Sequence, residues 1–179
     1  DAARQLGGSL VLKAIGLLHK SDAGGVLLNV DPADVKVKAQ DLIDRLNPSS
    51  LSVERMTRLD GAVEMIIGTV EDSQFGPMAL VGFGGIFAEI MNDTVLIMAP
   101  ATPGQVLTAL KKLRGYPMLT GARGRPPVNL TALAEAVAAL STHVASHAGI
   151  AAFEINPLLV GQHTIALDAR LVRTSSSRI

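Results

Sequence analysis

The sequence predicts an α+β fold, because its strand-like and helix-like runs are grouped rather than strictly alternating. Short apolar runs bounded by Gly, Pro and Asp–Gly turns indicate about seven strands. Apolar positions at 3.6-residue spacing, preceded by polar capping residues, indicate three helices. Hydrophobic residues make up 48% of the 179 residues and charged residues 18%, which fits a packed globule and excludes intrinsic disorder.

The first third of the chain is expected to run strand, loop, strand, helix. Strand-like runs at 9–14 and 26–30 flank a polar, glycine-ended loop at 19–25. We expect Asp31 to cap a helix with Pro32 at its first position, and this helix to end at Asn47–Pro48. Two further strand-like runs, at 51–56 and 62–70, lie on either side of the Asp60–Gly61 turn.

The rest of the chain is expected to contain strands and helices in small groups. Strands are predicted at 78–83 and 94–98, followed by a helix from Thr102–Pro103 to about 113. Residues 115–127 read as an irregular loop, and Asn129 is expected to cap a long helix ending near 149. A hairpin of strands at 153–160 and 164–171 closes the chain, ahead of a polar tail that is expected to fray.

The composition removes several classes of function. Lys plus Arg and Asp plus Glu each total 16, so the neutral chain has no global basic field to hold nucleic acid. An aromatic content of 3% makes a base-stacking platform a poor expectation. Without cysteine there is no disulfide, thiol nucleophile or Cys-ligated metal. The longest apolar run, at 78–88, is too short to span a membrane.

The C-terminal hairpin carries the best chemical signal. Strand alternation places Glu154 and Asn156 on one face, and Asp168 on the partner strand can join them. A two-residue turn would pair Asp168 with Ile155, on the wrong face, whereas a three-residue loop at 161–163 would set it opposite Asn156. A bulge at Pro157 would have a similar effect. Carboxylate and amide oxygens suit Mg²⁺ carrying phosphates; the competing interpretation is a solvated polar face.

A second signal lies near the N-terminus. Lys13 sits in an apolar strand, where a lysine is costly to bury unless it meets an anion. The loop at 19–25 offers a hydroxyl, a cation and backbone donors to a phosphate, but it does not match the Walker pattern. An exposed lysine on an amphipathic strand and an ordinary hairpin loop are the simpler interpretations.

Three further patterns are weaker. The glycines at 82–85 do not form a dinucleotide fingerprint, since residue 87 is Phe, but they allow close approach of backbone to phosphate, or a bulge. Arg123 and Arg125 can pair with phosphate or carboxylate, although loop arginines are usually solvated. His143 and His147 have i, i+4 spacing without a third ligand nearby, so a surface face is favoured over a metal site.

Taken in order, these residues resemble the ATP-grasp domain of the NDP-forming acyl-CoA synthetases. This group includes ADP-forming acetyl-CoA synthetase and, more distantly, the succinyl-CoA synthetase β subunit. The resemblance covers about residues 10–171, and each block is weak alone but the series is specific. The matching blocks are 11–13, 19–22 with 24–26, 72–77 (DSQFGP), 82–89 (GFGGIFAE), 123–127 (RGRPP), and 154–158 (EINPL) with 167–169.

The resemblance implies an ATP-grasp fold of two α+β lobes, at about 1–55 and 56–173, with the first lobe incomplete at its N-terminus and a flexible tail at 174–179. It implies ATP or ADP and Mg²⁺ as cofactors. The residues it assigns are, for the nucleotide, Lys13, Lys20, Ser21, Glu54, Met56, Glu64, Gly84 and Gly85; for the metal, Glu154, Asn156 and Asp168; and for the transferred phosphoryl group, His19, Arg123 and Arg125. Within these, Glu54 and Met56 are expected over the adenine and Glu64 at the ribose hydroxyls.

The implied function is phosphoryl transfer in acid + CoA + ATP ⇌ acyl-CoA + ADP + Pi, catalysed by a cytoplasmic, oligomeric ligase. A phosphohistidine on a CoA-binding domain or subunit carries the phosphoryl group in this family, and His19 is expected to act as a second relay. Because a CoA-binding domain is absent from these residues, the chain alone is not expected to turn over acyl-CoA. Two alternatives stay open: a regulatory nucleotide-binding domain fused to a protein lysine acetyltransferase, and a scaffold for subunit contacts. The sequence does not distinguish adenine from guanine nucleotides or identify the acyl group.

Overall fold

The computed structural model describes residues 2–17, 23–57, 61–85, 92–147 and 149–174. The chain divides into two compact units, Asp1–Arg58 and Leu59–Ile179, each with its own sheet. Both units combine antiparallel strands with helices, and the predicted α+β class is confirmed. None of the helices in these ranges is long and apolar enough to cross a bilayer.

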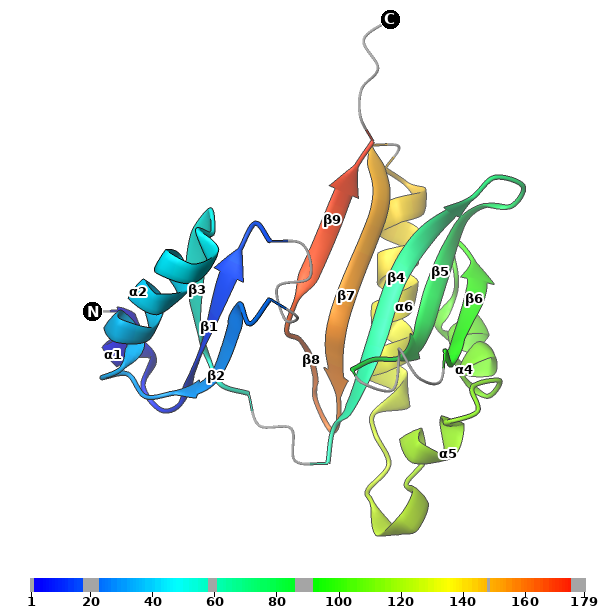
Figure 1. Cartoon of the computed structure of the whole chain (residues 1–179). Helices are drawn as coiled ribbons and strands as arrows, with labels where there is room; N and C mark the ends of the chain where they lie inside the picture. The colour runs from blue at the N-terminus through cyan, green and yellow to red at the C-terminus, as the bar shows by residue number, and fades with distance from the viewer. Residues whose placement is uncertain (1, 18–22, 58–60, 86–91, 148, 175–179) are drawn as a thin grey trace, which may run out of the picture. The chain divides into compact units, whose positions relative to one another are not determined.

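The first unit is a three-stranded antiparallel sheet with helices packed against it (Figure 1). Helix α2 packs on the central strand through buried Leu42, which meets Leu10, Leu12 and Val30. Because side chains alternate along a strand, Lys13 lies on the opposite face from Leu10 and Leu12. The sheet order is β2-β1-β3, and the elements are α1 (Ala2–Leu6), β1 (Leu10–Ile15), β2 (Val26–Val30), α2 (Val35–Leu46) and β3 (Ser50–Arg55).

The helix after β2 begins later than the sequence predicted. Asp31 Oδ1 accepts a hydrogen bond from the Ala33 amide at 2.8 Å, so this residue closes a local turn instead of capping a helix. The helix starts at Val35 behind Asp34, which makes no side-chain capping bond. Its predicted end is confirmed, since Asn47 adopts a left-handed conformation with φ of 43° and donates to the Ile43 carbonyl. Helix α1 was not predicted.

The second unit is a larger antiparallel sheet of order β6-β5-β4-β7-β8, with β9 also paired to β7. Helices α4 and α6 pack on one face, and α6 lies behind β4 and β7 in Figure 1. No described helix of this unit covers the other face, called the open face below. The elements are β4 (Val63–Asp72), β5 (Gly76–Phe83), β6 (Thr94–Met98), α4 (Pro103–Leu110), α5 (Tyr116–Leu119), a 3₁₀ turn at Ala122–Gly124, α6 (Leu130–Ala145), β7 (Ile150–Val160), β8 (Thr164–Ala166) and β9 (Ala169–Arg173).

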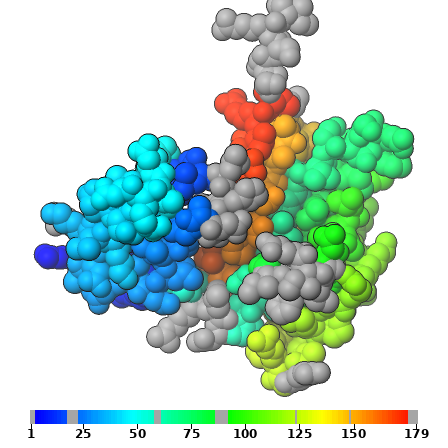
Figure 2. Space-filling model, viewed as in Figure 1, coloured from blue at the N-terminus to red at the C-terminus, as the bar shows by residue number. Residues whose placement is uncertain are grey.

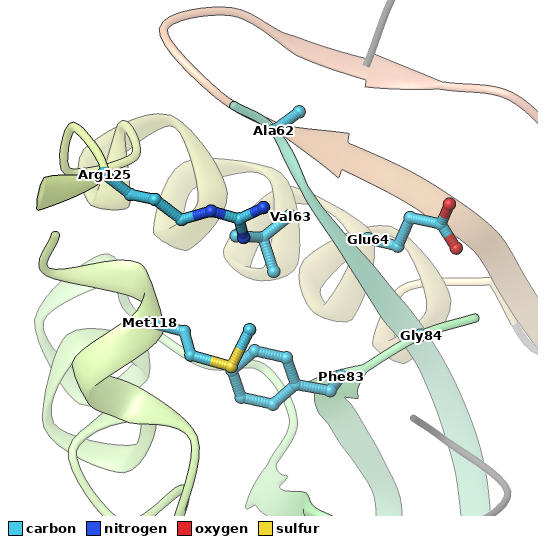
Figure 3. Close-up of a pocket in the computed structure, with 7 residues that line it drawn as sticks. All are labelled: Ala62, Val63, Glu64, Phe83, Gly84, Met118 and Arg125. Carbon is cyan, nitrogen blue, oxygen red and sulfur yellow. The ribbon is translucent and has the colours of Figure 1, made fainter. Parts of the chain in front are cut away.

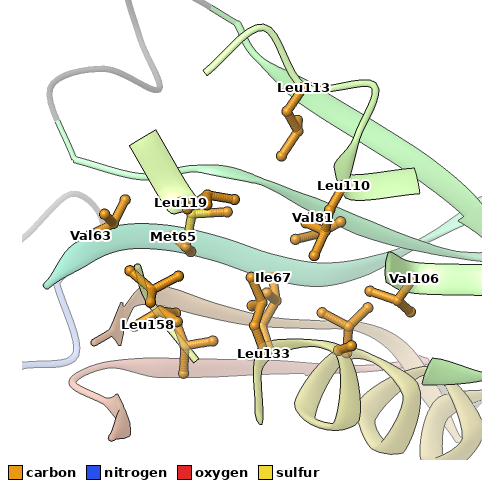
Figure 4. Close-up of a cluster of buried hydrophobic side chains, with 14 of the residues drawn as sticks. Val63, Met65, Ile67, Val81, Val106, Leu110, Leu113, Leu119, Leu133 and Leu158 are labelled. Carbon is orange, nitrogen blue, oxygen red and sulfur yellow. The ribbon is translucent and has the colours of Figure 1, made fainter. Parts of the chain in front are cut away.

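Alternate residues of β4 and β5 build the core of this unit (Figure 4). Met65, Ile67 and Val81 point toward Val106 of α4 and Leu133 of α6, and all five are fully buried. Each such side chain contributes roughly 1.5–3 kcal/mol through burial. The intervening residues of the same strands therefore face the open side, and this side carries the candidate site.

Several boundaries differ from the sequence prediction. The strand-like runs on either side of residues 60–61 lie in different sheets, β3 in the first and β4 in the second. The Asp60 half of the predicted turn lies outside the described residues. The loop at 115–127 contains α5 and the 3₁₀ turn, the helix after Pro103 ends at Leu110, and α6 ends at Ala145. The last predicted strand is interrupted at 167–168, between β8 and β9.

Candidate functional site

Glu64 and two glycines form one part of the open face. The Gly84 amide donates to the Glu64 carbonyl at 2.8 Å, which ties the end of β5 to β4. Gly85 has a φ of +62°, and the position that a Cβ would take there is occupied by Glu64 Oε2. Gly85 is thus required for the backbone to approach the Glu64 carboxylate this closely, whereas a Cβ at Gly84 would press against the backbone of Met65.

Asn156 and Asp168 meet across the C-terminal hairpin. Val160 pairs with Thr164, so the hairpin has the three-residue loop at 161–163 rather than a two-residue turn. The same register continues to the Asn156 amide, which donates to the Asp168 carbonyl at 3.1 Å. The structure thereby selects the alternative in which these two residues stand opposite each other, and both are half-buried.

A bulge in β7 keeps Asn156 on the open face. Met65 pairs with Leu158 and Ile67 with Ile155, so Ile66 alone faces both Asn156 and Pro157. This extra residue shifts the alternation, which lets Ile155 and Leu158 both join the core. The bulge that the sequence offered as a possibility is present, and it acts together with the three-residue loop.

Glu154 lies two residues along β7 from Asn156, on the same face. It pairs with Gly68 on β4 and with Arg170 on β9, and its side chain is exposed. Within the described ranges no three His, Cys, Asp or Glu side chains gather as a metal cluster by themselves. The predicted set Glu154, Asn156 and Asp168 instead combines two carboxylates with an amide oxygen, a hard donor set of the kind that Mg²⁺ prefers.

A pocket of about 250 Å³ opens beside Glu64, at the start of β4. In Figure 3 the Arg125 side chain extends over Val63, and Met118 lies beside the ring of Phe83. The Glu64 carboxylate points away from this group, on the other side of β4. The pocket is lined by Ala62, Val63, Glu64, Phe83, Gly84, Met118 and Arg125.

The structure separates Arg125 from the predicted metal ligands. Pro127, two residues beyond Arg125, accepts a hydrogen bond from Gln162 Nε2 at 3.1 Å, so this segment lies at the hairpin loop. Four residues of β7, or about 13 Å of strand, separate that loop from Asn156. Sequence reasoning did not find Phe83 and Met118, because only the packing of α5 against the end of β5 brings them together. The side chain of Arg123 lies outside the described residues.

In the first unit, Lys13 and Glu54 share one face of the sheet. Lys13 Nζ donates to Glu54 Oε2 at 2.6 Å, and Ser52 Oγ donates to Oε1 at 2.9 Å. Lys13 is only 8% exposed, so a carboxylate in contact offsets much of the cost of burying its charge. Met56 follows β3, and its amide donates to the Ser9 carbonyl. His19, Lys20 and Ser21 lie outside the described residues.

Comparisons with known proteins identify the family. The model of the ATP-grasp domain family matches residues 1–172. A trans-feruloyl-CoA synthase from an unknown prokaryotic organism is 35% identical over 96% of this chain and 26% of its own length. The β subunit of the ADP-forming acetate–CoA ligase I of Pyrococcus furiosus is 32% identical over 94% of this chain and 76% of that subunit.

Solved structures agree with these relatives. The dinucleotide-forming acetyl-coenzyme A synthetase 1 of Candidatus Korarchaeum cryptofilum, solved with coenzyme A and Mg-AMPPCP, matches with a TM-score of 0.85 and 30% identity. The match covers 97% of this chain and 80% of the synthetase chain. A second structure of that enzyme, with coenzyme A and Ca-AMPCP, has a TM-score of 0.89 and 28% identity, with the same coverage of both chains.

The two α+β units with their antiparallel sheets have the architecture of an ATP-grasp protein. Within that class, the chain belongs to the ATP-grasp domains of the ADP-forming acyl-CoA synthetases, as its resemblance predicted. It spans about a quarter of the length of the trans-feruloyl-CoA synthase and about three quarters of the separate β subunit.

Proposed function

We propose that the chain is the nucleotide-binding part of an ADP-forming acyl-CoA synthetase. It would exchange a phosphoryl group between the nucleotide and a phosphohistidine held elsewhere in the enzyme, in the reaction acid + CoA + ATP ⇌ acyl-CoA + ADP + Pi. The observation that carries this proposal is the register of the C-terminal hairpin, which brings Asn156 and Asp168 together on the face that also carries Glu64. Membership of the family and the nucleotide complexes of its solved members support it.

The residues present fit the divalent cation that this reaction uses. Asp168 and Asn156 would supply a carboxylate and an amide oxygen, and Glu154 lies beside them on the same face. A bound Mg²⁺ would supply positive charge to the phosphates and so lower the barrier to phosphoryl transfer. Two carboxylates and an amide hold such a cation without the soft ligands that would favour zinc.

The remaining residues would bind and orient the nucleotide. Glu64 has acceptor oxygens for the ribose hydroxyls, and Gly84 and Gly85, which carry no side chain, would let the backbone approach the phosphates. Lys13, which belongs to the first unit, would supply a positive charge to a phosphate. Phosphoryl transfer depends mostly on positioning and charge neutralisation, which is what such residues provide.

His19 is proposed as the histidine that relays the phosphoryl group within this chain. A neutral imidazole is a competent nucleophile near pH 7. The test is incubation of the full enzyme with γ-labelled ATP, beside a His19→Ala variant. Equal acid-labile label and equal turnover in the two proteins would remove His19 from the relay.

Calorimetric titration of Mg·ATP into the full synthetase tests the nucleotide site. We expect the wild type to bind Mg·ATP. In Asp168→Ala the affinity should fall by at least about tenfold, because a carboxylate ligand of the cation is removed. Asp34→Ala is the matched control, since Asp34 is exposed and its side chain caps nothing. Absence of binding to the wild type, or equal affinity in Asp168→Ala, would contradict the proposal.

A further inference from the structure

An apolar strip runs along the open face of the second unit, toward the β4–β5 hairpin tip. Val70, Leu96 and Met98 are 41%, 52% and 60% exposed. They are adjacent in space, because Val70 pairs with Met78, Met78 with Met98, and Leu80 with Leu96. Contiguous exposed apolar side chains of this size mark interaction surfaces more often than scattered ones do. The apolar strip is defined as Val70, Met78, Leu80, Leu96 and Met98 on the open face, together with Phe75 at the hairpin tip.

Phe75 stands at the tip of this hairpin on a fixed turn. Asp72 Oδ1 accepts hydrogen bonds from the amides of Gln74 and Phe75, at 2.8 and 2.9 Å. The aromatic side chain is 62% exposed and belongs to neither hydrophobic core. A turn whose backbone is held in this way needs less ordering on binding, which favours affinity. The hairpin end forms part of the molecular surface in Figure 2.

The apolar strip and the candidate nucleotide site lie on the same side of the sheet. Leu80 and Leu96 are followed along their strands by Gly82 and Thr94, which pair with each other. Gly82 in turn pairs with Ile66, the residue that faces the Asn156–Pro157 bulge. A protein seated on the strip would therefore contact the face that carries Asn156 and Glu64.

We propose that the apolar strip is the surface on which the CoA-binding part of the synthetase docks, as another stretch of the same polypeptide or as a separate subunit. This inference rests on the proposed function. The relatives include a single-chain synthetase almost four times as long as the matched region and a β subunit that is a separate chain. The proposed reaction thus needs a partner protein that reaches the open face to exchange the phosphoryl group. Phe and Met are enriched in the cores of such interfaces.

Photo-crosslinking in the full synthetase identifies the occupant. Benzoylphenylalanine is placed at position 75 and, as the control, at Val37, which is 74% exposed on α2 in the other unit. We expect the position-75 crosslink to map to peptides of the CoA-binding part. A crosslink confined to these 179 residues, a crosslink between two copies of this chain, or no product above the control would overturn the proposal.

Turnover provides an independent readout. In the full synthetase, Phe75→Ser and the double variant with Met98→Ser should lower ATP formation from acyl-CoA, ADP and phosphate by about tenfold or more, while Mg·ATP affinity stays within about twofold. Val37→Ser should change neither quantity. If both variants turn over at the wild-type rate, the proposed docking surface is wrong. Failure of the wild type to bind Mg·ATP would instead contradict the proposed function, because the crosslink does not depend on nucleotide.

Discussion

The ammonium of Lys13 and the carboxylate of Glu54 are joined by a hydrogen bond of 2.6 Å across neighbouring strands of the first sheet. The sequence predicted that Lys13 would need an anion, and within this structure Glu54 is one. Ser52 fixes the second oxygen of the same carboxylate, so the acceptor is held in place from two sides. Contact of Lys13 with a nucleotide phosphate stays a prediction.

Glu54→Gln should destabilise the protein by about 1–3 kcal/mol, because it leaves the nearly buried Lys13 ammonium without that negative charge. Urea unfolding followed by circular dichroism measures the loss. Asp41→Asn is the matched control: Asp41 pairs with Arg45 at 2.9 Å, but both side chains are about half exposed. We expect that exposed pair to contribute less than about 1 kcal/mol. Equal losses in the two variants would mean that burial of Lys13 does not strengthen its pairing.

Local sequence patterns predicted where the strands and helices lie better than they predicted which strands pair. The periodic segments at β1, β2, α2 and β6 lie within a residue or two of where spacing placed them, except for the start of α2. Spacing could not show that Asp31 would satisfy the Ala33 amide in a turn, because turn and cap use the same side-chain oxygen. Nor could it show that β3 and β4 belong to different sheets, since pairing is decided by tertiary contacts.

Gly85→Ala should weaken Mg·ATP binding by about tenfold, because the new methyl group would displace the Glu64 carboxylate that is proposed to hold the ribose. Gly76→Ala separates this effect from backbone strain. Gly76 has a φ of +74° with no heavy atom within 4 Å of its Cβ position. Both variants should lose about 1–2 kcal/mol of stability through the positive φ. Only Gly85→Ala should lose affinity in calorimetry; a similar loss in Gly76→Ala would attribute it to general destabilisation.

The candidate site was predictable where it depended on strand alternation and unpredictable where it depended on packing. Glu154 and Asn156 could be placed on one face from sequence alone, but choosing the partner of Asp168 required the length of the hairpin loop. The pocket at Arg125 needed the position of α5, a four-residue helix inside a segment that reads as irregular. Short helices of this kind are set by tertiary contacts, because they are too short to be stable alone.

Asp93 should be essential for the position of α5, which contributes Met118 to the pocket at Arg125. It is 5% exposed and accepts hydrogen bonds from the amides of Arg114 and Gly115, at 2.9 and 2.7 Å, just before α5. Asp93→Ala leaves both donors without this acceptor and should cost about 2–4 kcal/mol in urea unfolding. Arg114→Ala should cost much less, since its side chain is 66% exposed and its Nε lies 3.8 Å from Asp93. A loss in Arg114→Ala as large as in Asp93→Ala would assign the effect to the ion pair instead.

Asp72 should make the hairpin sensitive to acid. The hydrogen bonds from the Gln74 and Phe75 amides hold the pKa of this carboxyl below its usual value of 3.8. A carboxyl whose pKa is lower in the folded state stabilises the protein above its unfolded-state pKa, and this contribution is lost as the pH falls through the folded-state pKa. Asp72→Asn should therefore be less stable than the wild type at pH 7, and the gap should shrink below about pH 4. Urea unfolding across this pH range measures the gap, and Glu71→Gln controls for the change in net charge. A gap that is the same at neutral and acidic pH would show that the charge of Asp72 does not stabilise the turn.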